Sequence, residues 1–192
     1  MRVLVISDSH GRGMADLLES MYSWYTRSIV VPRSTDMVRV EYEHQLSSLE
    51  GFYPDAVLLH VGHNDVMSHP THNPHPMGSA LAFTRIERFM DKIQDDFPYA
   101  RIIYSSLFPR TIGSGMESAE RTAYNIEACI FGEMATSGCV VHRRRIVLNR
   151  VLWASPSEGK EKTHFFSRDG LHLNLLGKRA VLRDWAIALN AW

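Results

Sequence analysis

The chain has 192 residues, of which 45% are apolar and 22% charged, and its formal net charge is +0. This length suits one domain with its own hydrophobic core, and we expect a single domain over residues 1–192. The balanced charge gives no general attraction to nucleic acid or to anionic membranes. No apolar run approaches the ~18 residues that a membrane-spanning helix needs.

The first residues already form a strand pattern, without the apolar region and cleavage site of a secretory signal peptide. We therefore expect a cytoplasmic protein, with a secreted protein that has lost its signal peptide as the alternative. The chain contains two cysteines, Cys129 and Cys139, which lack metal-ligand spacing. Two free thiols are expected, and a disulfide between them is the alternative.

Apolar runs alternate with helical patterns along the chain. The first run, Val3-Leu4-Val5-Ile6, has the continuous apolar character of a strand that is buried on both faces. Further strands are expected at 28–32, 56–61, 101–107 and 138–142. Amphipathic helices are expected at 14–25, 38–49, 80–96, 117–136 and 175–189. This alternation predicts an α/β fold in which a parallel sheet carries helices on both faces.

Three polar turns hold the residues that could perform chemistry. Ser7-Asp8-Ser9 follows the first strand, Gly62-His63-Asn64-Asp65 follows the third, and Asp169-Gly170-Leu171-His172 precedes the last helix. In an open α/β sheet, ligands bind beyond the carboxyl ends of the strands. We therefore expect the first two turns to lie at a binding or catalytic site.

The residue types in these turns are those of acyl transfer. A serine hydroxyl such as that of Ser9 becomes a useful nucleophile only when a base removes its proton, and His172 could do so near neutral pH. Asp169, three residues earlier, could hold the imidazole in the required tautomer. The side-chain amide of Asn64 suits an oxyanion hole, where one donor contributes roughly 3 kcal/mol.

The three turns resemble the sequence blocks of the SGNH (GDSL-type) hydrolase superfamily, in the family's order. The resemblance implies a flavodoxin-like, three-layer α/β/α sandwich with a five-stranded parallel sheet, and ester hydrolysis without a cofactor or metal. It implies Ser9 as nucleophile, His172 as base and Asp169 as its partner. It also implies an oxyanion hole made by the Ser9 amide, the Asn64 side chain and a glycine amide after the second strand.

The chain departs from the family pattern at several positions. Pro32-Arg33-Ser34-Thr35 puts Arg33 where the family has the oxyanion-hole glycine, and we expect the Arg33 N–H to serve as the third donor. His10 and His63 replace residues that are usually apolar or small, and we expect both to lie beside the substrate. Asp8 and Asp65 are expected to brace their turns.

A narrower resemblance is to the esterase domains found in the first open reading frame of LINE-type retrotransposons. It is carried by three segments, His60 to Asp65, Ser105 to Arg110 and Asp169 to Lys178. It would imply an intracellular protein that accompanies retroelement RNA and contacts lipid. The basic run Arg143-Arg144-Arg145 is usually a solvated face, and its functional alternative is contact with RNA or anionic lipid.

The motifs and resemblances lead to two hypotheses for the function of the protein. The first is a serine esterase that hydrolyses short-chain or acetyl esters through an acyl-enzyme. The alternative is a weakly active or inactive module with the same fold that binds lipid, RNA or a protein partner. His69, His72 and His75 recur in a proline-rich segment, which we expect to be a loop near the substrate rather than a metal site.

Overall fold

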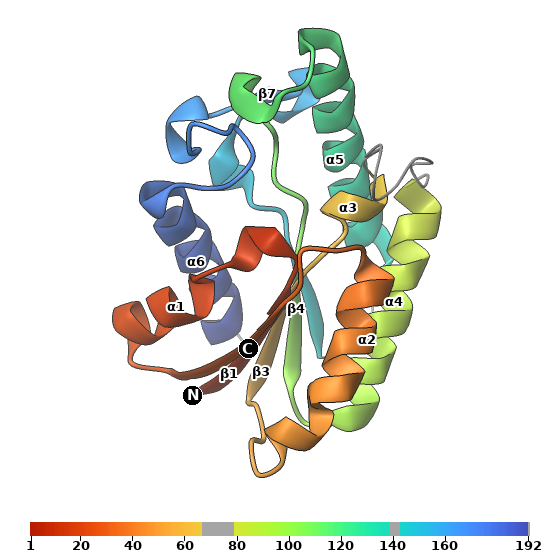
Figure 1. The fold of residues 1–192 in the computed structure, drawn as a ribbon, viewed down its shortest axis with the longest axis vertical. Coiled ribbons are helices and arrows are strands. Elements are labelled where there is room, and N and C mark those ends of the chain that lie inside the picture. The colour runs from red at the N-terminus through yellow and green to blue at the C-terminus, as the bar shows by residue number, and fades with distance from the viewer. Residues whose placement is uncertain (67–78, 139–142, 192) are drawn as a thin grey trace.

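The computed structural model describes residues 1–66, 79–138 and 143–191, and its centre is a parallel sheet of five strands in the order β2-β1-β3-β4-β5 (Figure 1). The strands are β1 (Arg2–Ser7), β2 (Tyr25–Val30), β3 (Ala56–His60), β4 (Arg101–Ser105) and β5 (Arg144–Val147). All four pairings are parallel, as the expected α/β fold requires.

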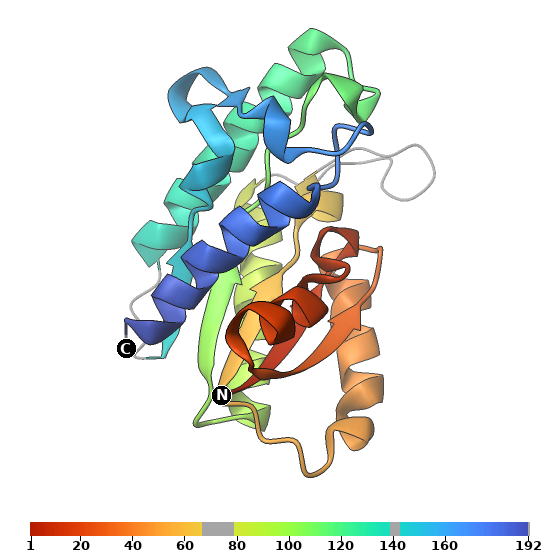
Figure 2. The ribbon, with the colours of Figure 1, turned by 90° about the vertical axis from the view of Figure 1, so that its left-hand side faces the viewer.

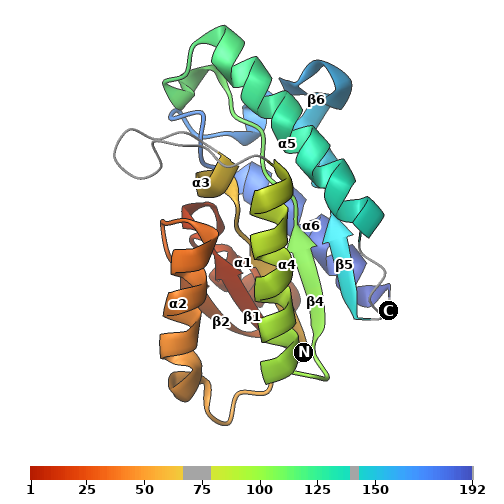
Figure 3. The same cartoon turned by 90° about the vertical axis from the view of Figure 1, so that its right-hand side faces the viewer.

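Helices cover both faces of this sheet. One face carries α1 (Met14–Tyr22) and α6 (Leu175–Asn190), which lie side by side (Figures 1 and 2). The other carries α2 (Thr35–Gln45), α4 (Ser79–Asp96) and α5 (Ser118–Gly138) in a row (Figure 3). The short α3 (His63–Val66) follows β3. The three-layer α/β/α sandwich expected from the sequence is therefore confirmed.

The central strands form the core because they have helices on both sides. Val3 to Ile6 of β1 have no exposed surface, and Ala56 to Leu59 of β3 are at most 1% exposed. Burial of one such aliphatic side chain contributes about 1.5–3 kcal/mol. These strands fix the position of the turns at their carboxyl ends, Asp8 to Gly11 and Val61 to Val66. No helix in the described part of the chain is long and apolar enough to cross a bilayer.

The first helix ends earlier than the sequence pattern suggested. Ser23 takes a left-handed conformation with φ of 56° and closes α1, so that β2 begins at Tyr25 rather than at Ser28. The aromatic residues Trp24 and Tyr25 continued the apolar pattern of the helix. Sequence periodicity therefore extended the helix past its true end.

The fifth strand also differs from its prediction at 138–142. Gly138 belongs to α5, residues 139–142 (Cys139 among them) lie outside the described residues, and the strand is Arg144–Val147. β5 is an edge strand, where charged side chains are tolerated because one side faces away from the core. The arginines of this strand interrupt its apolar pattern, so the sequence did not indicate a strand at this position.

The basic run is engaged in contacts within the protein. Arg143 donates to the carbonyl of Tyr99 at 2.7 Å, and Arg144 forms an ion pair with Asp91 at 2.7 Å. Arg145 donates to the carbonyl of Ala191 at 2.8 Å. These contacts tie the edge strand and the segment before it to neighbouring helices and loops. The structure thus gives the three arginines a role in packing.

Candidate active site

Ser9 lies at the carboxyl end of β1, where a turn of 3₁₀ helix (Ser9–Gly11) begins. Asp8 caps this turn, because its Oδ1 accepts the backbone N–H of His10 at 3.0 Å. The N–H of Asp8 donates to the carbonyl of His60, at the end of the neighbouring β3, at 3.1 Å. The bracing role expected of Asp8 is therefore confirmed, and the turn holds Ser9 at the carboxyl end of the sheet.

His172 and Asp169 lie in a tight turn just before α6. The N–H of Gly170 donates to the carbonyl of Ser167 at 3.0 Å, and the N–H of Ser167 donates to the carbonyl of His172 at 2.8 Å. Asn174 then caps α6 by accepting the N–H of Gly177 at 3.0 Å. The turn is thus closed on itself and anchored to a helix.

A second loop, residues 109–115, packs against this turn. The N–H of Thr111 donates to the carbonyl of Gly170 at 2.8 Å. Gly170 has φ of +64°, and a Cβ there would lie 2.4 Å from Thr111 Oγ1. A Cβ on Gly113 would lie 2.3 Å from the carbonyl oxygen of Arg168. Glycine is therefore required on both sides of this contact.

The three residues expected to perform catalysis lie together. Asp169 Oδ2 is 2.7 Å from His172 Nδ1, and Asp169 Oδ1 accepts the N–H groups of Leu171 and His172 at 2.9 and 3.0 Å. His172 Nε2 is 3.4 Å from Ser9 Oγ. Because Nδ1 donates to the carboxylate, Nε2 can present its lone pair to the serine hydroxyl. Distances of this kind often shorten only when substrate binds.

The Asp169 carboxylate remains ionised over a wide pH range. Partial burial raises its pKa, but the hydrogen bonds from His172 and from the N–H of Leu171 outweigh this effect, and the pKa falls to about 2. An ionised carboxylate at Nδ1 stabilises the imidazolium that forms when Nε2 takes a proton.

Asn64 and Arg33 contact each other in a way that the sequence did not predict. Asn64 Nδ2 donates to the carbonyl of Arg33 at 3.0 Å, and the N–H of Arg33 donates to the carbonyl of Val31 at 2.7 Å. The Arg33 N–H, expected as the third oxyanion donor, is thus directed at its own turn. Arg33 instead contributes a carbonyl that orients the Asn64 amide.

Asp65 has the bracing role that was expected. Its Oδ2 accepts the N–H and the hydroxyl of Thr35, at 2.9 and 2.8 Å, at the first residue of α2. Burial raises the pKa of Asp65, although the hydrogen bonds from Thr35 act in the opposite direction. The carboxylate joins α3 to α2, and it thereby fixes the segment that carries Asn64.

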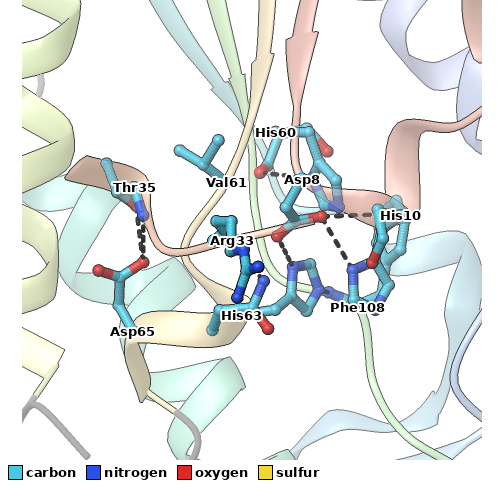
Figure 4. A network of polar contacts seen from close by, with 12 residues as sticks. Asp8, His10, Arg33, Thr35, His60, Val61, His63, Asp65 and Phe108 are labelled. Carbon is cyan, nitrogen blue, oxygen red and sulfur yellow. Dashed lines mark hydrogen bonds and ion pairs between the residues drawn. The ribbon is translucent and has the colours of Figure 1, made fainter. Parts of the chain in front are cut away.

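Asp8, His10 and His63 form a buried network in the turns that follow β1 and β3 (Figure 4). Asp8 Oδ1 is 2.9 Å from His10 Nδ1, and Asp8 Oδ2 is 3.1 Å from His63 Nδ1. The N–H of Phe108 donates to His63 Nε2 at 2.8 Å. Since Nε2 accepts, the proton of neutral His63 must be on Nδ1, where it donates to Asp8.

The chemistry of this network follows from its burial. Burial opposes ionisation of Asp8, but its electrostatic interactions and hydrogen bonds with the imidazoles of His10 and His63 prevail and hold its pKa well below the usual value. Burial, together with the neighbouring His10, holds the pKa of His63 well below its usual value. His63 is therefore neutral at physiological pH and acts as a hydrogen-bonding link between Asp8 and Phe108.

The ligand atoms of Asp8, His10 and His63 lie within 4.8 Å of one another, a spacing that a metal ion could bridge. A metal ion at His63 Nδ1 would move the proton to Nε2, where it would oppose the N–H of Phe108. This hydrogen bond therefore favours a proton network over metal ligation. His69, His72 and His75 lie outside the described residues.

The sequence predicted that His10 and His63 lie beside the substrate, and in the structure both side chains are buried next to Asp8. His63 has no exposed surface and His10 is 4% exposed. His60, at the end of β3, joins the same cluster: its Nδ1 donates to the carbonyl of Ser105 at 3.1 Å, and its ring stacks on Phe108. The sequence signal for this cluster was the presence of histidines after two adjacent strands, β1 and β3.

A separate cavity of about 550 Å³ lies between α5 and residues 148–157, with mostly apolar walls that include Ile126, Ile130 and Trp153. None of Ser9, Asp169 and His172 lines it. Cys129 also lies there, and its thiol is 3.3 Å from the carbonyl of Pro156. Burial raises the pKa of Cys129 to about 11, so the thiol is not a reactive nucleophile.

A scan against protein-family models and a search of curated proteins find no match. Solved structures do match. A GDSL-like lipase from Bacteroides thetaiotaomicron has a TM-score of 0.73 and 12% identity, over 99% of this chain and 88% of that one. A lipase/acylhydrolase from Enterococcus faecalis has a TM-score of 0.67 and 14% identity, over 97% and 94%. An acetylxylan esterase from Geobacillus stearothermophilus, in a catalytic mutant form, has a TM-score of 0.61 and 13% identity, over 98% and 93%. The chain thus has the α/β fold of SGNH hydrolases.

Proposed function

We propose that this protein is a serine esterase that hydrolyses carboxylic esters through an acyl-enzyme. The observation that carries the proposal is the connected series from Asp169 Oδ2 to His172 Nδ1, at 2.7 Å, and from His172 Nε2 to Ser9 Oγ, at 3.4 Å. These residues come from opposite ends of the chain, so their meeting is not a consequence of local sequence. The fold shared with lipases and acylhydrolases supports the same conclusion.

In the proposed reaction, His172 Nε2 takes the hydroxyl proton as Ser9 Oγ attacks the ester carbonyl carbon. The tetrahedral intermediate collapses, His172 gives the proton to the leaving alcohol, and the acyl group remains on Ser9. Water then attacks the acyl carbon, with its proton taken by His172, and the carboxylic acid leaves as Oγ is reprotonated. Asp169 holds the imidazole and stabilises its positive charge at both steps.

The oxyanion that forms at each step needs hydrogen-bond donors. We assign this role to the backbone N–H of Ser9 and to Asn64 Nδ2, which the carbonyl of Arg33 orients at 3.0 Å. Loss of one such donor costs about 3 kcal/mol of transition-state stabilisation. The N–H of Arg33, which donates to Val31, is left out of this assignment.

For the substrate we propose esters with short acyl groups, such as acetyl esters. A chain of 192 residues leaves little material for a deep acyl tunnel. The solved structures with this fold include an acetylxylan esterase and several lipases, so both a sugar and a lipid alcohol remain candidates for the leaving group.

The test is turnover of p-nitrophenyl esters of increasing acyl length by the wild type and by Ser9→Ala and His172→Ala. Ser20→Ala and His44→Ala, at exposed positions on α1 and α2, are the matched controls. We expect turnover to fall with acyl length and to be lost only in the first two variants. Turnover that survives in folded Ser9→Ala would refute the proposal. No wild-type turnover, with salt-sensitive RNA binding, would favour the binding module instead.

A further inference from the structure

The side chains of the proposed base and its partner are both partly exposed: His172 retains 37% of its surface and Asp169 retains 47%. Exposed side chains keep rotational freedom, which works against catalysis because a shift of about 1 Å can cost 100-fold in rate. The hydrogen bond from Nδ1 to Asp169 restrains one edge of the His172 ring. The ring still needs a contact that restrains its face.

His10 provides that contact. Its ring centroid lies 5.2 Å from that of His172, with an angle of 33° between the ring planes. On its other side His10 stacks on His63, with centroids 3.9 Å apart and planes 15° apart. The three imidazoles therefore pack in a series that begins in the buried network and ends at the catalytic ring.

His10 is itself held rigidly, unlike His172. Its side chain is 3% exposed, and its Nδ1 is 2.9 Å from Asp8 Oδ1. Asp8 is fully buried and is fixed in turn by His63, whose position the N–H of Phe108 determines. The contact offered to His172 thus comes from residues that are buried in the protein.

The anchor of His10 is a buried carboxylate. Asp8 is ionised, and the groups that interact with it from the neighbouring elements are His10, His60, His63, Tyr104 and Tyr124. In the buried interior, a carboxylate is screened far less than it is in water. Its hydrogen bond to His10 Nδ1, at 2.9 Å, therefore holds the His10 ring firmly in place.

We propose that His10, anchored by Asp8, is a positioning residue that holds the ring of His172 in line with Ser9 Oγ. This inference rests on the proposed esterase function. Asp8–His10 resembles Asp169–His172 in its contact through Nδ1, but its task is to support the catalytic imidazole rather than to move a proton.

Two substitutions separate the ring contact of His10 with His172 from its hydrogen bond to Asp8. His10→Phe keeps a ring against His172 but loses the hydrogen bond to Asp8. His10→Asn can still donate to Asp8 but loses the ring. We expect kcat to fall about 10-fold in His10→Phe and about 100-fold in His10→Asn, with KM within about twofold of the wild type. His44→Phe, on exposed α2, is the control.

A purely structural role would lower the unfolding midpoint without this change in kcat. The inference is overturned if both folded variants keep kcat within about twofold of His44→Phe. In that case only the inference about His10 fails, and the proposed esterase function stands because the wild type still hydrolyses the ester. If wild type and control show no turnover at all, the proposed function fails, and this inference fails with it.

A measurement on the wild type avoids the risk that the variants do not fold. The protein is labelled with ¹⁵N-histidine, and Ser9 is phosphorylated with diethyl p-nitrophenyl phosphate, which places a diethylphosphoryl group beside His172. We expect the imidazole nitrogen signals of His10 to shift together with those of His172, while those of His44 stay in place. Unchanged His10 signals after complete modification would overturn the inference.

Discussion

The contact between the turn Asp169 to His172 and residues 109–115 makes a sharp prediction for Gly170→Ala. At φ of +64° an alanine costs roughly 1–2 kcal/mol from backbone strain alone. The new Cβ would also meet Thr111 Oγ1 at 2.4 Å and the backbone N of Ser114 at 2.6 Å. Overpacking of this kind adds about 1–3 kcal/mol. The free energy of unfolding should therefore fall by about 2–5 kcal/mol.

Gly115→Ala is the matched control, because Gly115 has φ of +74° and nothing lies within 4 Å of the site of a Cβ. Its free energy of unfolding should fall only by the cost of backbone strain, about 1–2 kcal/mol. The assays are urea denaturation and kcat/KM for p-nitrophenyl acetate at a temperature where both variants are folded. We expect kcat/KM to fall about 100-fold in Gly170→Ala, because the turn must move His172 away from Ser9, and to change little in Gly115→Ala. Equal losses of stability and activity in the two variants would refute this reasoning.

Two further predictions concern ionisable groups. Asp169→Asn should lower kcat by about 10³–10⁴-fold in a folded protein, because the amide cannot hold the same tautomer of His172 or stabilise its charge; a fall below about tenfold would contradict this role. His60 is buried with its pKa lowered to about 4 by burial, so the unfolded chain binds its proton first and stability is lost as pH falls from about 6.5 towards 4. Chemical denaturation between pH 7 and pH 4 should show the wild type losing about 3 kcal/mol more than His60→Gln, and parallel pH dependences of the two proteins would contradict it.

Much of the fold could be predicted because buried parallel strands leave a direct signal. The continuous apolar runs at Val3 and Ala56 marked β1 and β3, and the helical patterns between strands fixed the layers. β5 was misplaced because an edge strand does not need an apolar sequence, and its Arg144 and Arg145 form contacts with neighbouring elements instead. The early end of α1 depended on one left-handed residue, Ser23, whose conformation has no strong sequence signal.

The site was predictable where it depends on residue types and less so where it depends on backbone direction. Ser9, Asp169 and His172 could be singled out because two short blocks carry them, and a third block carries Asn64. The direction of the Arg33 N–H depends on the local turn, which points it at Val31. Likewise, only the backbone path after β1 and β3 decides that His10 and His63 turn inward to Asp8.

The most direct test of the central claim is covalent modification of the nucleophile. The wild type is treated with diethyl p-nitrophenyl phosphate, and the adduct is located by intact mass and peptide mapping. We predict one diethylphosphoryl group per chain, attached to Ser9, and none in Ser9→Ala or His172→Ala under the same conditions. An unmodified wild-type protein, or an adduct on a different residue, would contradict the assignment of Ser9 and His172.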